Sequence, residues 1–301
     1  VKEYRVYQVD AFTTEVFRGN PAGVVTNADG LSDTQMQDIA RELNNSETAF
    51  ILSPTANDHD IWIRFFTPST EVPICGHATI ASHFVRAIEE NTSSSIVRQK
   101  SGVGILPVET LKDDLGYQIV MTQGTPEFSP PFDKETSNFI LTAIGIEPIE
   151  VDTRCPMQIV STGHSKVLIG INSLNTLHQL KPSMTDLSRL SSEVDCNGFF
   201  VFTLDSDDPE VFAHGRMFAP AIGIPEDPVT GNANGPLGAY LAKYNLKHSD
   251  QDGLISFRAR QGEAIGRVGD VDISVSSKPN MSPIVKIAGR AVVAFKTEIS
   301  L

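Results

Sequence analysis

Residues 64–68 read Arg-Phe-Phe-Thr-Pro and residues 216–220 read Arg-Met-Phe-Ala-Pro, so one pattern occurs twice, 152 residues apart. Four residues further on, each copy continues with a proline, in Pro-Ile-Cys at 73–75 and in Pro-Glu-Asp at 225–227. Cys75 and Asp227 therefore occupy equivalent positions. A period this long indicates two similar domains rather than a solenoid.

Three further pairs of segments extend the repeat: residues 19–25 with 162–168, 31–43 with 184–194, and 45–50 with 195–200. The second pair predicts an amphipathic helix in each copy, and in the first helix Ser32 and Gln35 form a capping box. We therefore predict an α+β protein of two lobes, 1–126 and 127–301, related by a pseudo-twofold axis. A C-terminal strand or two could cross back into the first lobe. The proline-rich residues 125–131 are the expected linker.

The composition limits the classes of partner. The formal net charge is -13, from 24 basic and 37 acidic residues, which disfavours nucleic acid and anionic membrane surfaces. No run of about 18 apolar residues predicts a membrane span. The three cysteines are widely spaced, which argues against a disulfide framework and a structural zinc site. We expect a cytoplasmic protein whose ligand is a small anionic metabolite.

Two loops of small residues, 73–79 and 226–235, each lead into an apolar helix. Unpaired N–H groups at a helix start attract anions, so two such loops facing each other across a cleft between the lobes could hold one carboxylate substrate. The alternative is that the glycines only form turns and caps. Their equivalent places in the repeat favour binding.

Four residues carry candidate chemistry. His77 lies just inside a helix start, where the helix dipole favours the neutral ring. Asp227 precedes a proline, so its backbone is extended and its carboxylate can point into the cleft. Glu47 precedes an apolar strand, and its repeat counterpart is Asn197, an asymmetry that suits a site with a single base. Cys75 could act as a thiol acid/base or be a small buried residue.

Motifs for cofactors are lacking. The sequence has no P-loop, GxGxxG, HExxH or GxSxG pattern, and no His/Asp/Glu set with metal-ligand spacing. We therefore expect direct proton transfer without a cofactor or a metal.

Five ordered motifs resemble the phenazine-biosynthesis PhzF-like family, and most closely its YddE branch. They lie at residues 9–13, 19–25, 46–50, 73–79 and 226–233. The resemblance covers essentially the whole chain. It implies a diaminopimelate epimerase-like fold, in which a sheet wraps round a central helix in each lobe. The central helices would be residues 78–88 and 236–244.

The resemblance also implies a function. A family member isomerises a dihydroxyanthranilate by shifting a proton, and its acid/base glutamate matches Glu47. Its supporting histidine and aspartate match His77 and Asp227, and its serine is replaced here by Asn232. With the two loops, these matches define the expected substrate-binding residues: Asn20, Cys75, Gly76, Ala78, Thr79, Gly231, Asn232 and Ala233. We expect an isomerase with Glu47, His77 and Asp227 as its catalytic residues.

Other functions stay open at this point. Related epimerases use two facing cysteines, but only Cys75 is present here, so a Cys75/Asp227 two-base epimerase is the remaining variant. A non-catalytic protein that binds small anions, or an interaction scaffold, could use the same lobes. Sheet edges in both lobes suggest a homo-oligomer, with a homodimer expected.

Overall fold

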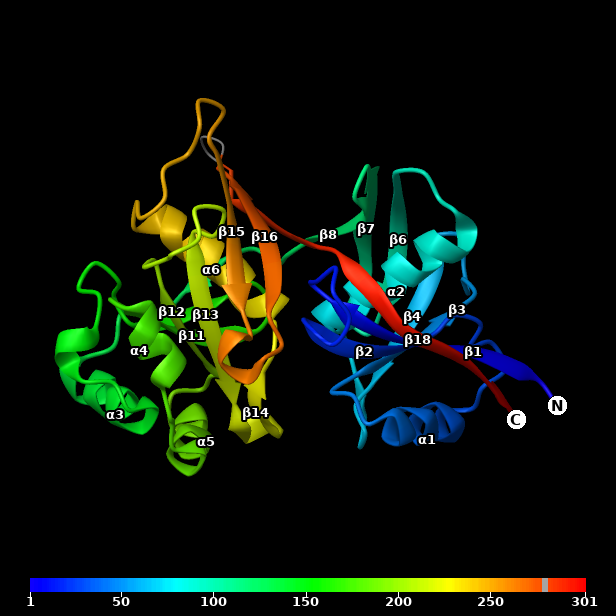
Figure 1. Ribbon diagram of the computed structural model, residues 1–301, viewed down its shortest axis with the longest axis horizontal. Helices are drawn as coiled ribbons and strands as arrows, with labels where there is room; N and C mark the ends of the chain where they lie inside the picture. Colours follow the sequence, from blue (N-terminus) through cyan, green and yellow to red (C-terminus); the bar gives the residue numbers. More distant parts are fainter. Residues whose placement is uncertain (278–280) are drawn as a thin grey trace. The chain divides into compact units, whose positions relative to one another are not determined.

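The computed structural model describes residues 1–277 and 281–301. This part of the chain forms two compact units, one of residues 1–122 with 288–301 and one of residues 123–287. Strand β18 (Ala291–Ser300, red in Figure 1) pairs antiparallel with strand β1 (Glu3–Ala11, blue), which places the end of the chain in the first unit. The second unit is therefore an insertion in the sequence of the first.

The first unit is a mixed sheet around one helix. Its other elements are β2 (Asn20–Val25), α1 (Asp33–Leu43), β3 (Thr48–Leu52), β4 (Ile61–Phe66), β5 (Glu71–Val72), α2 (Gly76–Glu90), β6 (Ser95–Ser101), β7 (Gly104–Asp113) and β8 (Gly116–Thr122). Helix α2 contacts strands on several sides, among them β1, β2, β3, β7, β8 and β18. Nine of its fifteen residues are buried, so α2 is the central helix of this unit.

The second unit repeats this arrangement. Its elements are β9 (Glu127–Phe128), α3 (Lys134–Ile144), β10 (Gln158–Ser161), β11 (Ser165–Ile171), α4 (Leu174–Gln179), α5 (Met184–Glu193), β12 (Phe199–Thr203), β13 (Ala213–Ala219), β14 (Ile224–Asp227), α6 (Gly231–Lys243), β15 (Leu254–Gln261) and β16 (Gly269–Ser276), with 3-10 turns η1 (Pro148–Glu150), η2 (Pro220–Ile222) and η3 (Glu263–Ile265). Strand β17 (Ile284–Gly289) begins in this unit and ends in the first. Helix α6 contacts β10, β11, β15 and β16 and is the central helix.

Strand pairing makes the repeat visible. In the first unit β2–β3 is parallel, β3–β4 and β4–β5 are antiparallel, and β4–β6 is parallel. In the second unit β11–β12, β12–β13, β13–β14 and β13–β15 follow the same order of parallel and antiparallel pairs. The two copies of the sequence pattern therefore encode the same topology.

Two predictions about helix α1 are confirmed. Ser32 caps α1, and both hydrogen bonds of the capping box with Gln35 are present. The apolar face of α1 is buried through Met36, Ile39 and Ala40. All three cysteines are free and buried. None of the helices in the described residues is both long and apolar enough to cross a membrane.

Two boundaries differ from prediction. Helix α6 begins at Gly231 rather than at Pro236, so the proline lies inside the helix, where it removes a hydrogen bond and crowds the preceding turn. Ten of the thirteen helix residues are buried, and this burial stabilises α6 in spite of the proline. The proline-rich residues 125–131, expected to be a linker, contribute Phe128 to a pair with Val160 of β10. The units instead divide between residues 122 and 123.

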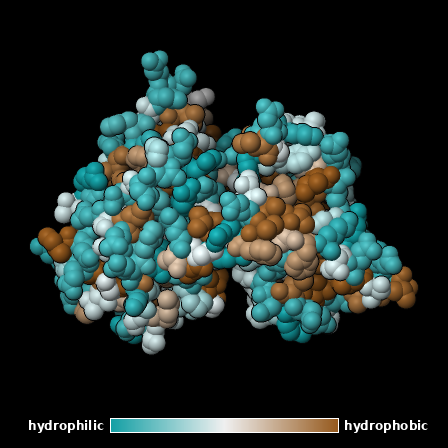
Figure 2. Space-filling view, in the orientation of Figure 1, coloured by the Kyte–Doolittle hydropathy of each residue, from teal (hydrophilic) through white to brown (hydrophobic). Residues whose placement is uncertain are grey.

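The surface is mixed in polarity. Figure 2 shows a mostly polar face on which apolar side chains gather in patches. On strands β6 and β7, Ile96, Ile105 and Leu111 are exposed. The expected homodimer stays a prediction.

Candidate active site

Three of the predicted residues meet in the first unit. The Glu47 carboxylate oxygen Oε2 lies 3.5 Å from Nε2 of His77, and the two side chains are only 15% and 8% exposed. On the other side of the ring, Cys75 Sγ lies 3.4 Å from Nδ1. The atoms that the three side chains offer lie within 4.8 Å of one another, a spacing that a metal ion could also use. The imidazole thus lies between a carboxylate and a thiol.

Both ring nitrogens of His77 have a partner. A neutral imidazole has one donor and one acceptor nitrogen, and a thiol can donate while a carboxylate only accepts. One assignment that satisfies both nitrogens has Cys75 donating to Nδ1 and the Nε2–H directed toward Ser46 and Glu47. Ser46 Oγ lies 3.3 Å from the same Nε2 and adds a second acceptor there. Sequence reasoning missed Ser46, whose repeat counterpart is Cys196.

The start of α2 positions this cluster. Cys75 is the extended N-cap residue, and its carbonyl accepts hydrogen bonds from the amide and the hydroxyl of Thr79. No side chain caps this helix, whereas side chains cap α1, α3, α4 and α5. The first amides of α2, including those of Gly76 and Ala78, therefore keep donors for a ligand.

Asn20 and Glu47 lie on neighbouring segments of the first unit. Asn20 is buried at the start of β2, and the amide of Gly23 in the same strand donates to the carbonyl of Glu47 at 3.3 Å. Strand β2 thus fixes the backbone from which the Glu47 side chain projects.

The second unit holds the other predicted residues at the start of α6. The Thr230 hydroxyl donates to the Asp227 carboxylate, and Gln261 Nε2 donates to the carbonyl of Asp227 at 2.8 Å. Gln261 Oε1 accepts from the amide of Thr230 at 3.0 Å. Gln261 therefore holds the loop at both ends, a role that nothing in the sequence pattern indicated.

No side chain caps α6 either, so Gly231, Asn232 and Ala233 form a first turn like that of α2. The two central helices are the only α-helices in the described residues whose N-termini lack a side-chain cap. Their repeat-related starts are thus suited to an anionic ligand.

Arginine–carboxylate pairs hold the hairpins that lead to both loops. Arg64 makes a two-pronged contact with Glu71 at 2.8 and 2.7 Å and lies over the ring of Phe66. Its repeat counterpart Arg216 contacts Glu226 at 2.9 and 2.8 Å and lies over Phe218. The paired carboxylates raise the pKa of Arg64 further, so this clamp stays charged.

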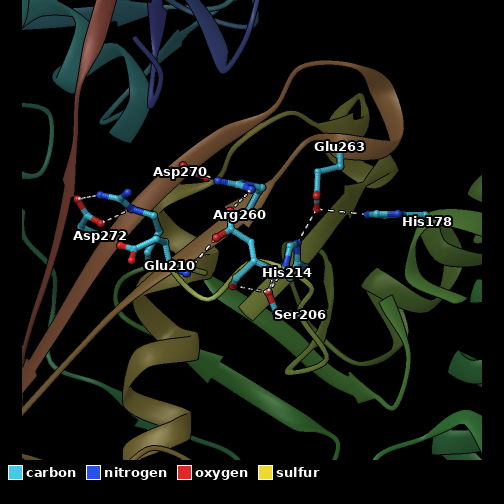
Figure 3. A network of polar contacts seen from close by, with 10 residues as sticks. His178, Ser206, Glu210, His214, Arg260, Glu263, Asp270 and Asp272 are labelled. Atoms are coloured by element: carbon cyan, nitrogen blue, oxygen red, sulfur yellow. Dashed lines mark hydrogen bonds and ion pairs between the residues drawn. The ribbon is translucent and has the colours of Figure 1, made fainter. Parts of the chain in front are cut away.

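A separate polar network lies elsewhere in the second unit (Figure 3). His214 is fully buried and contacts Glu263 through Nδ1 at 2.7 Å and Ser206 Oγ through Nε2 at 2.9 Å. This order resembles a serine–histidine–acid triad. The Ser206 hydroxyl, however, donates to the carbonyl of Asp208 and accepts from its amide, so it stabilises its own turn. We assign the network a structural role.

Comparisons with known proteins agree on one family. Residues 9–297 match the family model of PhzC-PhzF, phenazine biosynthesis-like protein. An uncharacterized isomerase from Clostridium acetobutylicum is 55% identical over 301 residues, which are 100% of this chain and 99% of that protein. The uncharacterized isomerase YddE from Escherichia coli K12 is 45% identical over 294 residues, 98% of this chain and 97% of its own.

Solved structures agree. A phenazine biosynthesis protein of the PhzF family from Bacillus anthracis has a TM-score of 0.90 at 31% identity, and the match covers 100% of both chains. A hydroxyproline epimerase from Agrobacterium vitis has a TM-score of 0.62 at 10% identity, covering 99% of this chain and 93% of that one, and it shows the fold alone. The resemblance and the epimerase-like α+β fold predicted from the sequence are confirmed.

Proposed function

The chain is an isomerase of the phenazine biosynthesis-like PhzC-PhzF family, and from this premise we propose that it shifts a proton on a small carboxylate-bearing metabolite with Glu47 as general acid/base. The observation that carries the proposal is the 3.5 Å contact between the mostly buried Glu47 carboxylate and His77. A carboxylate shielded from water can take a proton from a carbon and return it to another.

His77 has a supporting role in this reaction. Its Nε2–H faces Glu47 and orients the carboxylate, while Cys75 fixes the ring through Nδ1. When Glu47 is protonated, Nε2–H is free to donate to negative charge that develops on the substrate. The sequence resemblance supports the corresponding role of Asp227.

The substrate carboxylate would bind at an uncapped helix start. The amides of Gly76 and Ala78 in α2, and those of Gly231 and Asn232 in α6, are donors aligned with a helix dipole. This arrangement supports an anionic substrate, in agreement with the motif match.

Glu47→Gln tests the proposal, because glutamine keeps the shape of the side chain and cannot carry the proton. The assay is proton NMR of candidate carboxylates in D2O, including hydroxyproline and methylitaconate, compounds named for two proteins of similar fold. For a compound that exchanges a C–H with the native protein, we expect Glu47→Gln to slow exchange by about 10²–10⁴-fold. The exposed Glu42→Gln is the matched control. Full exchange by Glu47→Gln removes Glu47 from the role.

A second candidate is a Cys75/Asp227 two-base epimerase. The 3.4 Å contact between Cys75 Sγ and His77 Nδ1 favours it, since an imidazole can accept the thiol proton. Cys75→Ala separates the two mechanisms. It would abolish inversion at a stereocentre if the thiol is a base, and would leave Glu47-dependent exchange in place if the thiol only positions His77. Binding of carboxylates with no exchange by any variant would indicate a non-catalytic anion-binding protein.

A further inference from the structure

Lys166 is buried in the second unit. It lies on β11 and is 3% exposed, although lysine side chains are almost never buried without a charged partner. Its Nζ donates to the carbonyl of Ser165 at 3.3 Å and, among the described residues, makes no ion pair. One long hydrogen bond to a neutral acceptor does not compensate a buried ammonium.

The fold does not require a lysine at this position. In the first unit Val24 of β2 pairs with Ala49, and in the second unit Val167 of β11 pairs with Phe199, the repeat counterpart of Ala49. Val24 and Val167 are therefore equivalent, and so are the residues that precede them, Gly23 and Lys166. A Cβ on Gly23 would come within 2.7 Å of Thr48 Oγ1, which shows that the first unit builds the same strand pair with no side chain there. The lysine is therefore specific to the second unit, and packing of the repeat does not explain it.

The charges around Lys166 place it close to the candidate site. Burial lowers the pKa of its ammonium to about 8, while the nearby Cys196 and Asp227 act in the opposite direction. With that pKa, most of the amine is charged at pH 7. Asp227 is bound to Thr230, the N-cap residue of α6. Strand β11, which carries Lys166, contacts α6, and the ammonium lies near the aspartate that binds the N-cap residue of α6.

The Lys166 ammonium and the first turn of α6 would both bind an anion. An ammonium has three N–H donors, and Ser165 uses one of them. The first turn of α6 offers further N–H donors and the positive end of a helix dipole. A carboxylate ligand supplies acceptor oxygens for both sets of N–H donors.

We propose that Lys166 is the cation that binds the substrate's carboxylate, together with the first amides of α6. The proposal rests on the proposed function, because it assumes that the substrate is an anion. Lys166 is then a substrate-binding residue of the second unit, and the equivalent residue of the first unit is Gly23.

The test is an NMR titration of the full chain with acetate, and with acetamide as a neutral probe of the same shape. We expect saturable acetate shifts at the Lys166 Cε signal and at the amides of Gly231 and Asn232, and no such shifts with acetamide. Lys166→Met should weaken acetate binding at least tenfold, while the exposed Lys181→Met should bind as the native chain does. The Lys166 signal is assigned by its loss in Lys166→Met, or by residue-specific labelling if that variant does not fold.

Two results would overturn the proposal: a Lys166 signal that does not respond to acetate, or native acetate affinity in a folded Lys166→Met. Glu47→Gln distinguishes this failure from failure of the proposed function. That variant should bind acetate normally, whether or not it loses deuterium exchange. If exchange does not depend on Glu47 and acetate still binds at Lys166, the carboxylate site at Lys166 is supported and the acid/base role of Glu47 is refuted.

Discussion

His83 makes the first unit sensitive to mild acid. The residue lies in the middle of α2, is 1% exposed, and its Nε2 contacts Gln99 Oε1 at 2.8 Å. Burial lowers the pKa of the imidazole to about 4 from its ordinary 6.5, against the opposing effect of the Gln99 hydrogen bond. Because the folded pKa is the lower one, the stability is complete above pH 6.5 and is lost as the pH falls toward 4.

The size of the effect follows from the shift. About 2.5 pKa units correspond to about 3 kcal/mol, of which about 2 kcal/mol is lost by pH 5, before most carboxylates titrate. His83→Gln keeps a donor for Gln99 but does not titrate in this range. We therefore expect native stability to fall between pH 8 and pH 5 by about 2 kcal/mol more than that of the variant.

Trp62, the single tryptophan, provides the assay because it lies on β4 in the same unit as His83. Urea unfolding is followed by its fluorescence at several pH values for the native chain, for His83→Gln and for His248→Gln, an exposed control. Equal pH dependence of the native chain and His83→Gln would refute the reasoning. So would a flattened profile in His248→Gln.

Three further changes probe the second unit. Gly198→Ala should cost about 1–3 kcal/mol in thermal unfolding, because φ is +152° and a Cβ would overlap Met217. Arg216→Gln should cost about 3–5 kcal/mol in urea unfolding by leaving Glu226 buried and unpaired, with partial recovery in the Arg216→Met/Glu226→Leu double variant. Burial opposes ionisation of Glu263, but its two histidine partners lower its pKa overall, so Glu263→Gln should reduce the loss of circular dichroism as the pH falls below about 4.5. If a variant gives the same result as the native chain in its assay, the physical reason given for that variant is wrong.

Much of the fold could be predicted from the sequence because short sequence motifs mark the repeat and the start of a helix. The offset that relates Arg64 to Arg216 also relates strands β4 and β13, which pair in the same way, although the carboxylates that the two arginines bind, Glu71 and Glu226, are 155 residues apart. Ser32 and Gln35 signalled a helix start through contacts three residues apart. The start of α6 was missed because a proline there resembles a first helical residue, and only burial of the preceding turn keeps those residues helical.

The candidate site was predictable only in part. Glu47 and His77 could be selected from their motifs, yet their contact depends on how β3 and α2 pack, which no spacing encodes. For Lys166 the sequence left two readings open, a substrate contact or a surface residue, because its burial depends on neighbours distant in sequence. Gln261 lies 34 residues beyond the aspartate whose carbonyl it holds, so only the folded chain reveals its role.

Pairing of β1 with β18 has a consequence for biosynthesis. Strand β1 leaves the ribosome long before its partner β18, because Glu3 pairs with Ser300. Residues 123–287 are continuous and can fold during translation, whereas the first unit must wait, with one edge of β1 open to other chains. A nascent chain stalled before residue 291 should therefore protect its middle from protease while its beginning stays sensitive. The order of synthesis thus makes the unit that carries Glu47 the last to be completed.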